Sequence, residues 1–66
     1  MTLEINGEIQ SLPSIKNIEE LLQYLGLGHD RIAVEVNRRI VRRQEWERTP
    51  LNDRDRIEIV QFVGGG

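Results

Sequence analysis

The chain has 66 residues, so it forms one domain at most and leaves little room for an enclosed active site. It contains no cysteine, which excludes a disulfide, a zinc–thiolate site and a thiol nucleophile within the chain. Nine basic and eleven acidic residues give a net charge of −2, so the chain as a whole is not attracted to nucleic acid.

Hydropathy gives no sign of a membrane segment. No apolar stretch approaches the roughly 18 residues that a membrane span requires. The first residues also lack the basic region and long apolar run of a signal peptide. We therefore expect a cytoplasmic protein without membrane contact.

The first strands are predicted around the Asn6-Gly7 pair, whose residues tolerate the positive φ of a tight hairpin. Leu3 and Ile5 alternate with polar residues before it. A two-residue turn would place Ile5 opposite Glu8, whereas a three-residue loop over 6–8 would place Ile5 opposite Ile9 on the apolar face. We expect the three-residue loop, with a bulge.

A helix is predicted to begin near residue 18. Pro13 ends the second strand, and Asn17 with Glu20 three positions later has the shape of a capping box. Gly26 or Gly28 can end the helix in a left-handed conformation. One apolar stripe then faces the core, formed by Ile18, Leu21, Leu22 and Leu25.

A second hairpin follows the helix. Alternation over 32–36 predicts a strand, and Asn37-Arg38 marks a turn into a short strand at 40–41. Four arginines crowd this segment and suggest either contact with RNA or an acidic partner, or simply a solvated hairpin and edge strand. The solvated hairpin is the favoured interpretation of Arg38, Arg39, Arg42 and Arg43.

Periodicity fades from Arg42 to Asp55, which predicts a crossing loop with one short helical turn pinned by Trp46. A last strand resumes at Ile57 and runs to Val63. The order of elements predicts an α+β chain of the β-grasp, ubiquitin-like arrangement, in which a mixed four- to five-stranded sheet packs on one helix. We expect a single domain over residues 1–63, with the last strand central beside the first.

The three final glycines form a predicted flexible tail over residues 64–66. Without Cβ atoms, Gly64, Gly65 and Gly66 can thread a slot too narrow for side chains and reach roughly 10 Å beyond the strand. A frayed terminus is the plainer alternative. Just before the tail, Val60 and Phe62 point away from the core face, so we expect them to be exposed and to dock a partner.

Other chemistry is scarce. His29 is expected in a surface loop without a recognisable nucleophile beside it. Asp53 and Asp55 fit turn residues better than a metal site, so no metal is implied. Gly26-Leu27-Gly28 lacks the spacing and lysine of a phosphate-binding loop, and we expect no ATP binding by the chain alone.

In order along the chain, several segments together resemble the ThiS family, the sulfur carriers of thiamin biosynthesis. They are the Asn6-Gly7 hairpin, 18–22, 32–37, Ile40-Val41 with Arg43 and Trp46, and most specifically 51–60 with 62–66. Two residues depart from the family pattern: Arg54 stands where glycine is frequent, and Arg42 where proline is frequent. Arg54 suggests that its turn needs no positive φ or tolerates some strain.

The resemblance implies a carrier rather than an enzyme. A ThiF-like enzyme would adenylate the Gly66 carboxylate with ATP and Mg²⁺, and a sulfur donor protein would supply sulfur for a thiocarboxylate. A ThiG-like thiazole synthase would then receive the sulfur. Gly64 and Gly65 would let the tail enter both partners, and the carrier alone would be a monomer.

Three alternatives remain open. The small subunit of molybdopterin synthase is also a β-grasp sulfur carrier with a terminal Gly-Gly. A protein modifier would form isopeptide bonds through Gly66, although the single lysine, Lys16, limits chain building. A plain binding module with an inert tail is the third.

Overall fold

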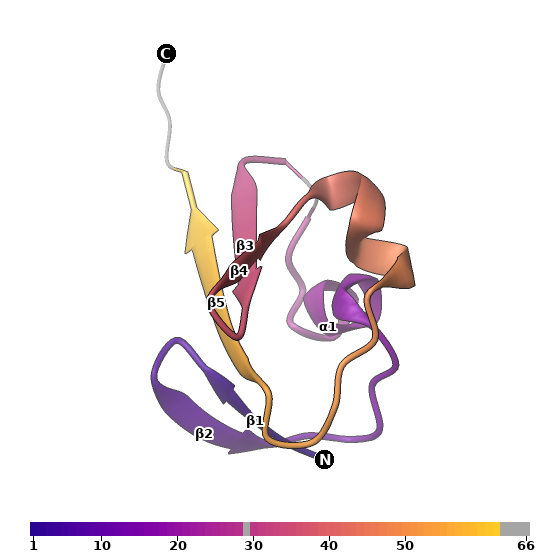
Figure 1. Ribbon diagram of the computed structural model, residues 1–66, viewed down its shortest axis with the longest axis vertical. Helices are drawn as coiled ribbons and strands as arrows, with labels where there is room; N and C mark the ends of the chain where they lie inside the picture. Colours follow the sequence, from indigo (N-terminus) through magenta and orange to yellow (C-terminus); the bar gives the residue numbers. More distant parts are fainter. Residues whose placement is uncertain (29, 63–66) are drawn as a thin grey trace.

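A single sheet with one helix packed against it organises the chain, as the computed structural model shows for residues 1–28 and 30–62 (Figure 1). The elements are β1 (Thr2–Ile5), β2 (Glu8–Ser11), α1 (Ile18–Tyr24), β3 (Ile32–Val36), β4 (Arg39–Val41), the 3-10 helix η1 (Arg43–Arg48) and β5 (Arg56–Gln61). The sheet order is β2-β1-β5-β3-β4. β1 and β5 run parallel, and the other neighbours run antiparallel. The predicted α+β, β-grasp arrangement and the central place of the last strand are confirmed.

The start of α1 is capped as the sequence predicts. Asn17 Oδ1 accepts a hydrogen bond from the Glu20 main-chain N–H at 2.8 Å. Glu20 Oε1 reaches back one residue further than expected and accepts from the N–H of Lys16 at 3.1 Å. The first bond satisfies a donor that the first turn of a helix leaves without a partner, and the second ties the residue before the N-cap to that turn.

The end of α1 is closed by Gly26, which has a φ of 74°. Its N–H donates to the carbonyl of Gln23 at 3.0 Å, and the N–H of Leu27 donates to the carbonyl of Leu22 at 2.9 Å. This pair of bonds is the Schellman motif, in which a left-handed residue lets the last helical carbonyls find donors. Of the two glycines considered from the sequence, Gly26 therefore ends the helix.

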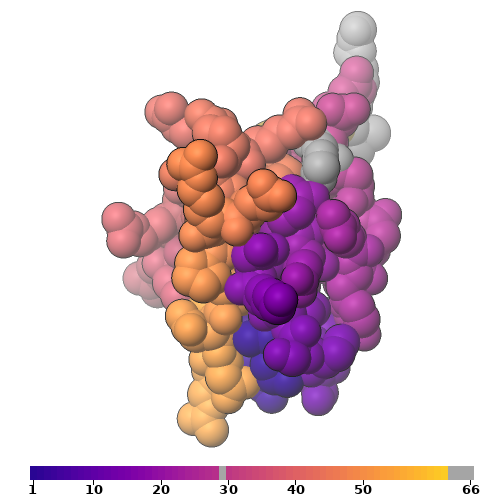
Figure 2. All heavy atoms as spheres, turned by 90° about the vertical axis from the view of Figure 1, so that its right-hand side faces the viewer, coloured from indigo at the N-terminus to yellow at the C-terminus, as the bar shows by residue number. Residues whose placement is uncertain are grey.

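The core lies between the sheet and a layer formed by α1 and η1, which pack against each other. Figure 2 views this layer from outside, with the helix in purple beside the orange segment that includes η1. Trp46 is 1% exposed, and its indole N–H donates to the carbonyl of Val41 at 2.9 Å. The buried residues are Leu3, Ile5, Leu12, Ile15, Ile18, Leu21, Leu22, Val34, Trp46, Leu51, Ile57 and Ile59.

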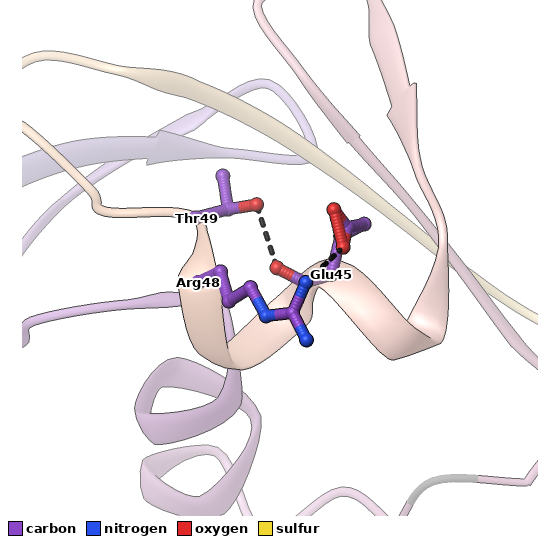
Figure 3. A network of polar contacts seen from close by, with 3 residues as sticks. All are labelled: Glu45, Arg48 and Thr49. Atoms are coloured by element: carbon purple, nitrogen blue, oxygen red, sulfur yellow. Dashed lines mark hydrogen bonds and ion pairs between the residues drawn. The ribbon is translucent and has the colours of Figure 1, made fainter.

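Polar contacts close the end of η1 (Figure 3). The Thr49 hydroxyl donates to the main-chain carbonyl of Glu45 at 2.7 Å, and the Arg48 guanidinium lies 3.4 Å from the Glu45 carboxylate. These contacts satisfy a carbonyl in the last turn. The predicted crossing loop thus contains its short helical turn, with Trp46 buried beneath it.

The first hairpin differs from the sequence prediction. Ile5 pairs with Glu8 across a two-residue turn in which Asn6 and Gly7 have φ values of 50° and 82°. The expected three-residue loop is wrong, and Ile9 is 77% exposed instead of facing the core. Two positive φ values suit the twist of a two-residue hairpin, and that turn geometry outweighs the pairing of Ile5 with another apolar residue.

Candidate functional site

The strand that leads towards the glycines, β5, is the central strand of the sheet. It pairs with β1 on one side and with β3 on the other. The strand ends at Gln61, although the N–H of Phe62 still donates to the carbonyl of Arg31 at 2.7 Å. The prediction that the strand includes Phe62 is therefore wrong. Val63, the tail residues 64–66 and His29 lie outside the described residues.

Two turn asparagines fix β5 from opposite sides. Asn6 Nδ2 donates to the carbonyl of Ile59 at 3.2 Å, and Asn6 Oδ1 accepts from the Ile59 N–H at 2.7 Å. On the other side, Asn37 Oδ1 accepts from the N–H of Arg56 at 3.0 Å, and the N–H of Asn37 donates to the Arg56 carbonyl at 2.8 Å. These side chains act as extra backbone amides and hold the strand along most of its length.

Val60 and Phe62 are exposed, as the sequence predicts, with 51% and 57% of their surfaces accessible. Val60 lies opposite Ala33 of β3, which carries a small side chain and leaves Val60 uncovered. Both residues lie at the end of β5 that leads to Gly64, Gly65 and Gly66. Their exposure is confirmed, and their role in docking stays a prediction.

The apolar surface is wider than the sequence indicated. We call the sheet face turned away from α1 the open face. Glu58 and Val60 point to this face of β5. Glu58 pairs with Glu35, and Glu35 pairs with Ile40, so Ile40 lies on the same face. Ile9 pairs with Glu4, so Ile9 also lies on it. Each is 77% exposed. Sequence reasoning missed Ile9 because the three-residue loop assigned it to the core; the Asn6-Gly7 signal for a two-residue turn would have placed it correctly.

The four crowded arginines do not form one basic patch. Arg39 and Arg42 line a groove of ≈610 Å³ beside β4 and η1. Arg43 lies 3.8 Å from the carboxylate of Asp30. Arg38 instead lines a separate hollow of ≈270 Å³ with Glu4, Asn37, Arg54 and Arg56. Because β4 is an edge strand and these side chains are exposed, the arrangement of Arg39, Arg42 and Arg43 agrees with the solvated hairpin favoured from the sequence.

The turn between the two aspartates takes a strained backbone. Arg54 has a φ of 71°, so of the two possibilities raised by the sequence, the turn tolerates strain. Asp53 Oδ1 accepts from the N–H of Thr2 at 2.7 Å, and Asp55 Oδ2 accepts from the N–H of Asn52 at 2.8 Å. Asp55 therefore acts as the predicted turn residue, whereas Asp53 ties this loop to the start of β1.

Two absences hold for residues 1–28 and 30–62. Within them, no group of three or more His, Asp or Glu side chains is arranged to hold a metal ion. No helix in this part of the chain is both long enough and apolar enough to cross a membrane.

Comparison with known proteins places the chain in a family. The family model for ThiS matches residues 2–66. The chain belongs to the ThiS family. The sulfur carrier protein ThiS of Bacillus subtilis is 37% identical over 65 residues, covering 97% of this chain and 98% of that protein. The predicted role as a sulfur carrier of thiamin biosynthesis is thereby confirmed at the level of the family.

Two further relatives extend the comparison. The crystal structure of a thiamine biosynthesis protein (ThiS) from Geobacter metallireducens has a TM-score of 0.83 and 30% identity, with full coverage of both chains. A protein named thiazole synthase from Paramagnetospirillum magneticum is 41% identical over all 66 residues. The chain spans 20% of the length of that relative.

Proposed function

We propose that this ThiS-family chain carries sulfur as a thiocarboxylate on Gly66 and delivers it for the thiazole moiety of thiamin. The observation that carries the proposal is the match to the sulfur carrier ThiS over 98% of that relative's length. The central, doubly paired β5 supports it, because a strand held on both sides gives the glycines a stiff mount.

The chemistry needs activation of the carboxylate. At neutral pH an α-carboxylate is an anion and a poor electrophile. A ThiF-like enzyme using ATP and Mg²⁺ would join the Gly66 carboxylate to AMP and release pyrophosphate. The outer sulfur of a persulfide on a donor protein would then attack the acyl carbon, and AMP would leave. A thiol would attack the donor's sulfur in the resulting acyl disulfide, forming a disulfide with the donor and releasing the thiocarboxylate.

The chain's own residues serve transfer in two ways. Gly64 and Gly65 would let the acyl carbon enter a narrow cleft, first of the activating enzyme and then of a ThiG-like thiazole synthase. The exposed apolar residues of the open face, Val60 and Phe62 foremost, would hold the body of the carrier against each partner. The thiazole synthase named among the relatives fits the second partner.

Intact mass spectrometry with fragmentation tests this function. We expect that incubation with the activating enzyme, ATP, Mg²⁺ and a sulfur donor exchanges one oxygen of Gly66 for sulfur, and that omission of ATP prevents it. Replacing Gly65 with leucine should leave folding intact and block adenylation. An unmodified Gly66 under complete conditions would contradict the proposal, and Gly66 joined to lysines of other proteins would identify a modifier instead.

The acceptor is tested separately. The loaded carrier is incubated either with a ThiG-like thiazole synthase or with the large subunit of a molybdopterin synthase. We expect loss of sulfur from Gly66 only with the thiazole synthase. Loss of sulfur only to the molybdopterin enzyme would assign the chain to that pathway.

A further inference from the structure

Three arginines from separate segments gather at the start of β5. Arg38 comes from the β3–β4 turn, Arg54 from the loop before β5, and Arg56 from β5 itself, and all three line the ≈270 Å³ hollow. The hollow contains one carboxylate, Glu4, which lies 3.2 Å from the Arg56 guanidinium. Arg38 and Arg54 form no ion pair with another described residue. Among the residues that line the hollow, three guanidinium groups meet one carboxylate, and Asp53 and Asp55 flank Arg54 in the sequence.

The main chain beneath the cluster is firmly held. The N–H of Arg54 donates to the carbonyl of Thr2 at 2.6 Å. Arg56 exchanges hydrogen bonds with Asn37, whose Nδ2 also donates to Asp55 Oδ1 at 3.0 Å. The arginines therefore project from fixed points, and a partner would meet a preorganised charge pattern.

Two of the three arginines occupy backbone positions that suit other residues better. Arg38 and Arg54 have φ values of 70° and 71°, in the left-handed region where glycine and asparagine are favoured. Backbone conformation therefore does not explain why arginine occupies either position. A function of the guanidinium groups in the hollow would explain it.

We propose that the arginine cluster of Arg38, Arg54 and Arg56 is an electrostatic docking site for a carboxylate-rich segment of the enzyme that activates Gly66. This inference rests on the proposed function. Arginine pairs with carboxylates through two parallel hydrogen bonds, which fixes orientation as well as contact.

The position of the cluster favours a protein partner over a small phosphate ligand. A second hollow of ≈240 Å³, lined by Arg54, Ile9 and Glu4 among others, continues from the cluster onto the open face. The cluster also remains open to water, with 52% of the Arg56 side chain exposed. Because β5 spans six residues at about 3.3 Å each, the acidic segment should lie roughly 20 Å from the cleft that receives the tail.

Association kinetics test the proposal with matched charge changes. The double variant Arg38→Asn, Arg54→Gly removes two charges and places residues that accept positive φ. The control Arg42→Gln, Arg48→Gln removes two charges outside the cluster, with Arg48 79% exposed in its side chain. Each carrier is mixed with the activating enzyme in a stopped-flow instrument over a range of salt concentrations.

We expect the cluster variant to associate about three- to tenfold more slowly than the wild type at low salt and equally fast at high salt, because ions screen steering. The control variant should slow association with the activating enzyme by much less. Equal slowing of both double variants would overturn the proposal, since net charge alone would then explain it. Saturable binding of pyrophosphate to the carrier alone, lost in the cluster variant, would assign the cluster to a phosphate ligand and also overturn it.

Failure of this inference is separable from failure of the proposed function. At saturating carrier, we expect both double variants to acquire sulfur on Gly66 as the wild type does. If the wild type itself is never adenylated, the proposed function fails whatever the arginines do. If the wild type is adenylated and the cluster variant associates at the wild-type rate, only the docking site fails.

Discussion

The side-chain amide of Asn6 forms both of its hydrogen bonds with the main chain of Ile59, donating at 3.2 Å and accepting at 2.7 Å. The two residues are 53 positions apart in the sequence. Their contact extends the parallel pairing of β1 with β5 beyond Ile5 and Ile57, although Asn6 already belongs to the turn. One residue thus shapes the first hairpin and anchors the last strand.

Replacing Asn6 with glycine should lower the free energy of unfolding by about 2 kcal/mol, roughly 1 kcal/mol for each lost hydrogen bond. Alanine at the same position should cost about 1 kcal/mol more, because it also disfavours the φ of 50°. Urea unfolding followed by circular dichroism measures both. Losses below about 0.5 kcal/mol for the glycine variant would show that water replaces the bonds to Ile59 without cost.

Arg54→Gly should be more stable than Arg54→Ala by about 1 kcal/mol, because only glycine accepts a φ of 71° without strain. Both variants remove the same guanidinium group, so their difference isolates the backbone. Thermal and urea unfolding give the comparison. Equal stabilities would mean that this turn relaxes to another conformation when arginine is removed.

Glu35 and Glu58 lie directly opposite each other on the open face, where like charges repel. Glu58→Gln should raise the free energy of unfolding by about 0.2–0.5 kcal/mol at low salt. The gain should vanish at high salt, where screening already removes the repulsion. A gain that persists in high salt would point to a cause other than charge.

Trp46→Ala should cost about 3–5 kcal/mol, since the ring is 1% exposed and joins η1 to the core. In so small a domain this is a large part of the total stability. Trp46→Phe keeps most of the ring and loses the indole donor to Val41, so it should cost less. Urea unfolding of the two variants separates packing from the hydrogen bond, and equal costs would contradict that separation.

Phe62→Ala should leave stability nearly unchanged and lower kcat/KM for adenylation of Gly66 by about tenfold, as expected for an apolar contact at an interface. Tyr24→Ala is the matched control, because Tyr24 is 54% exposed but lies on α1, away from the open face. Steady-state release of pyrophosphate by the activating enzyme reports the effect. Equal losses in both variants would argue against docking through the open face.

Local signals in the sequence were sufficient for most of the fold. The capping residues Asn17 and Glu20, the glycine after the helix and the alternation in 32–36 each depend on neighbouring residues, and each leads to the observed element. Trp46 was identified as the anchor of the crossing loop because it is a large apolar residue in an otherwise polar stretch. These features need no knowledge of distant contacts.

The errors and omissions involve contacts between distant segments. Apolar pairing favours Ile5 opposite Ile9, whereas the turn places Ile5 opposite Glu8. The bonds from Asn6 to Ile59 that accompany the two-residue turn cannot be read from neighbouring residues. The arginine cluster likewise does not follow from the sequence, because Arg38 is adjacent to Arg39 in the chain and only the fold brings it to Arg54 and Arg56. Strand register and turn conformation determine both the pairing partner of Ile5 and the assembly of the arginine cluster.

The central place of β5 has a mechanical consequence. Under the proposed function, an enzyme that drew the glycines into its cleft would pull along the axis of this strand, against β1 on one side and β3 on the other. Hydrogen bonds roughly perpendicular to such a pull are loaded in shear and resist together, whereas an edge strand pulled sideways would peel away one bond at a time. The carrier is therefore arranged so that traction on its end does not unravel its fold.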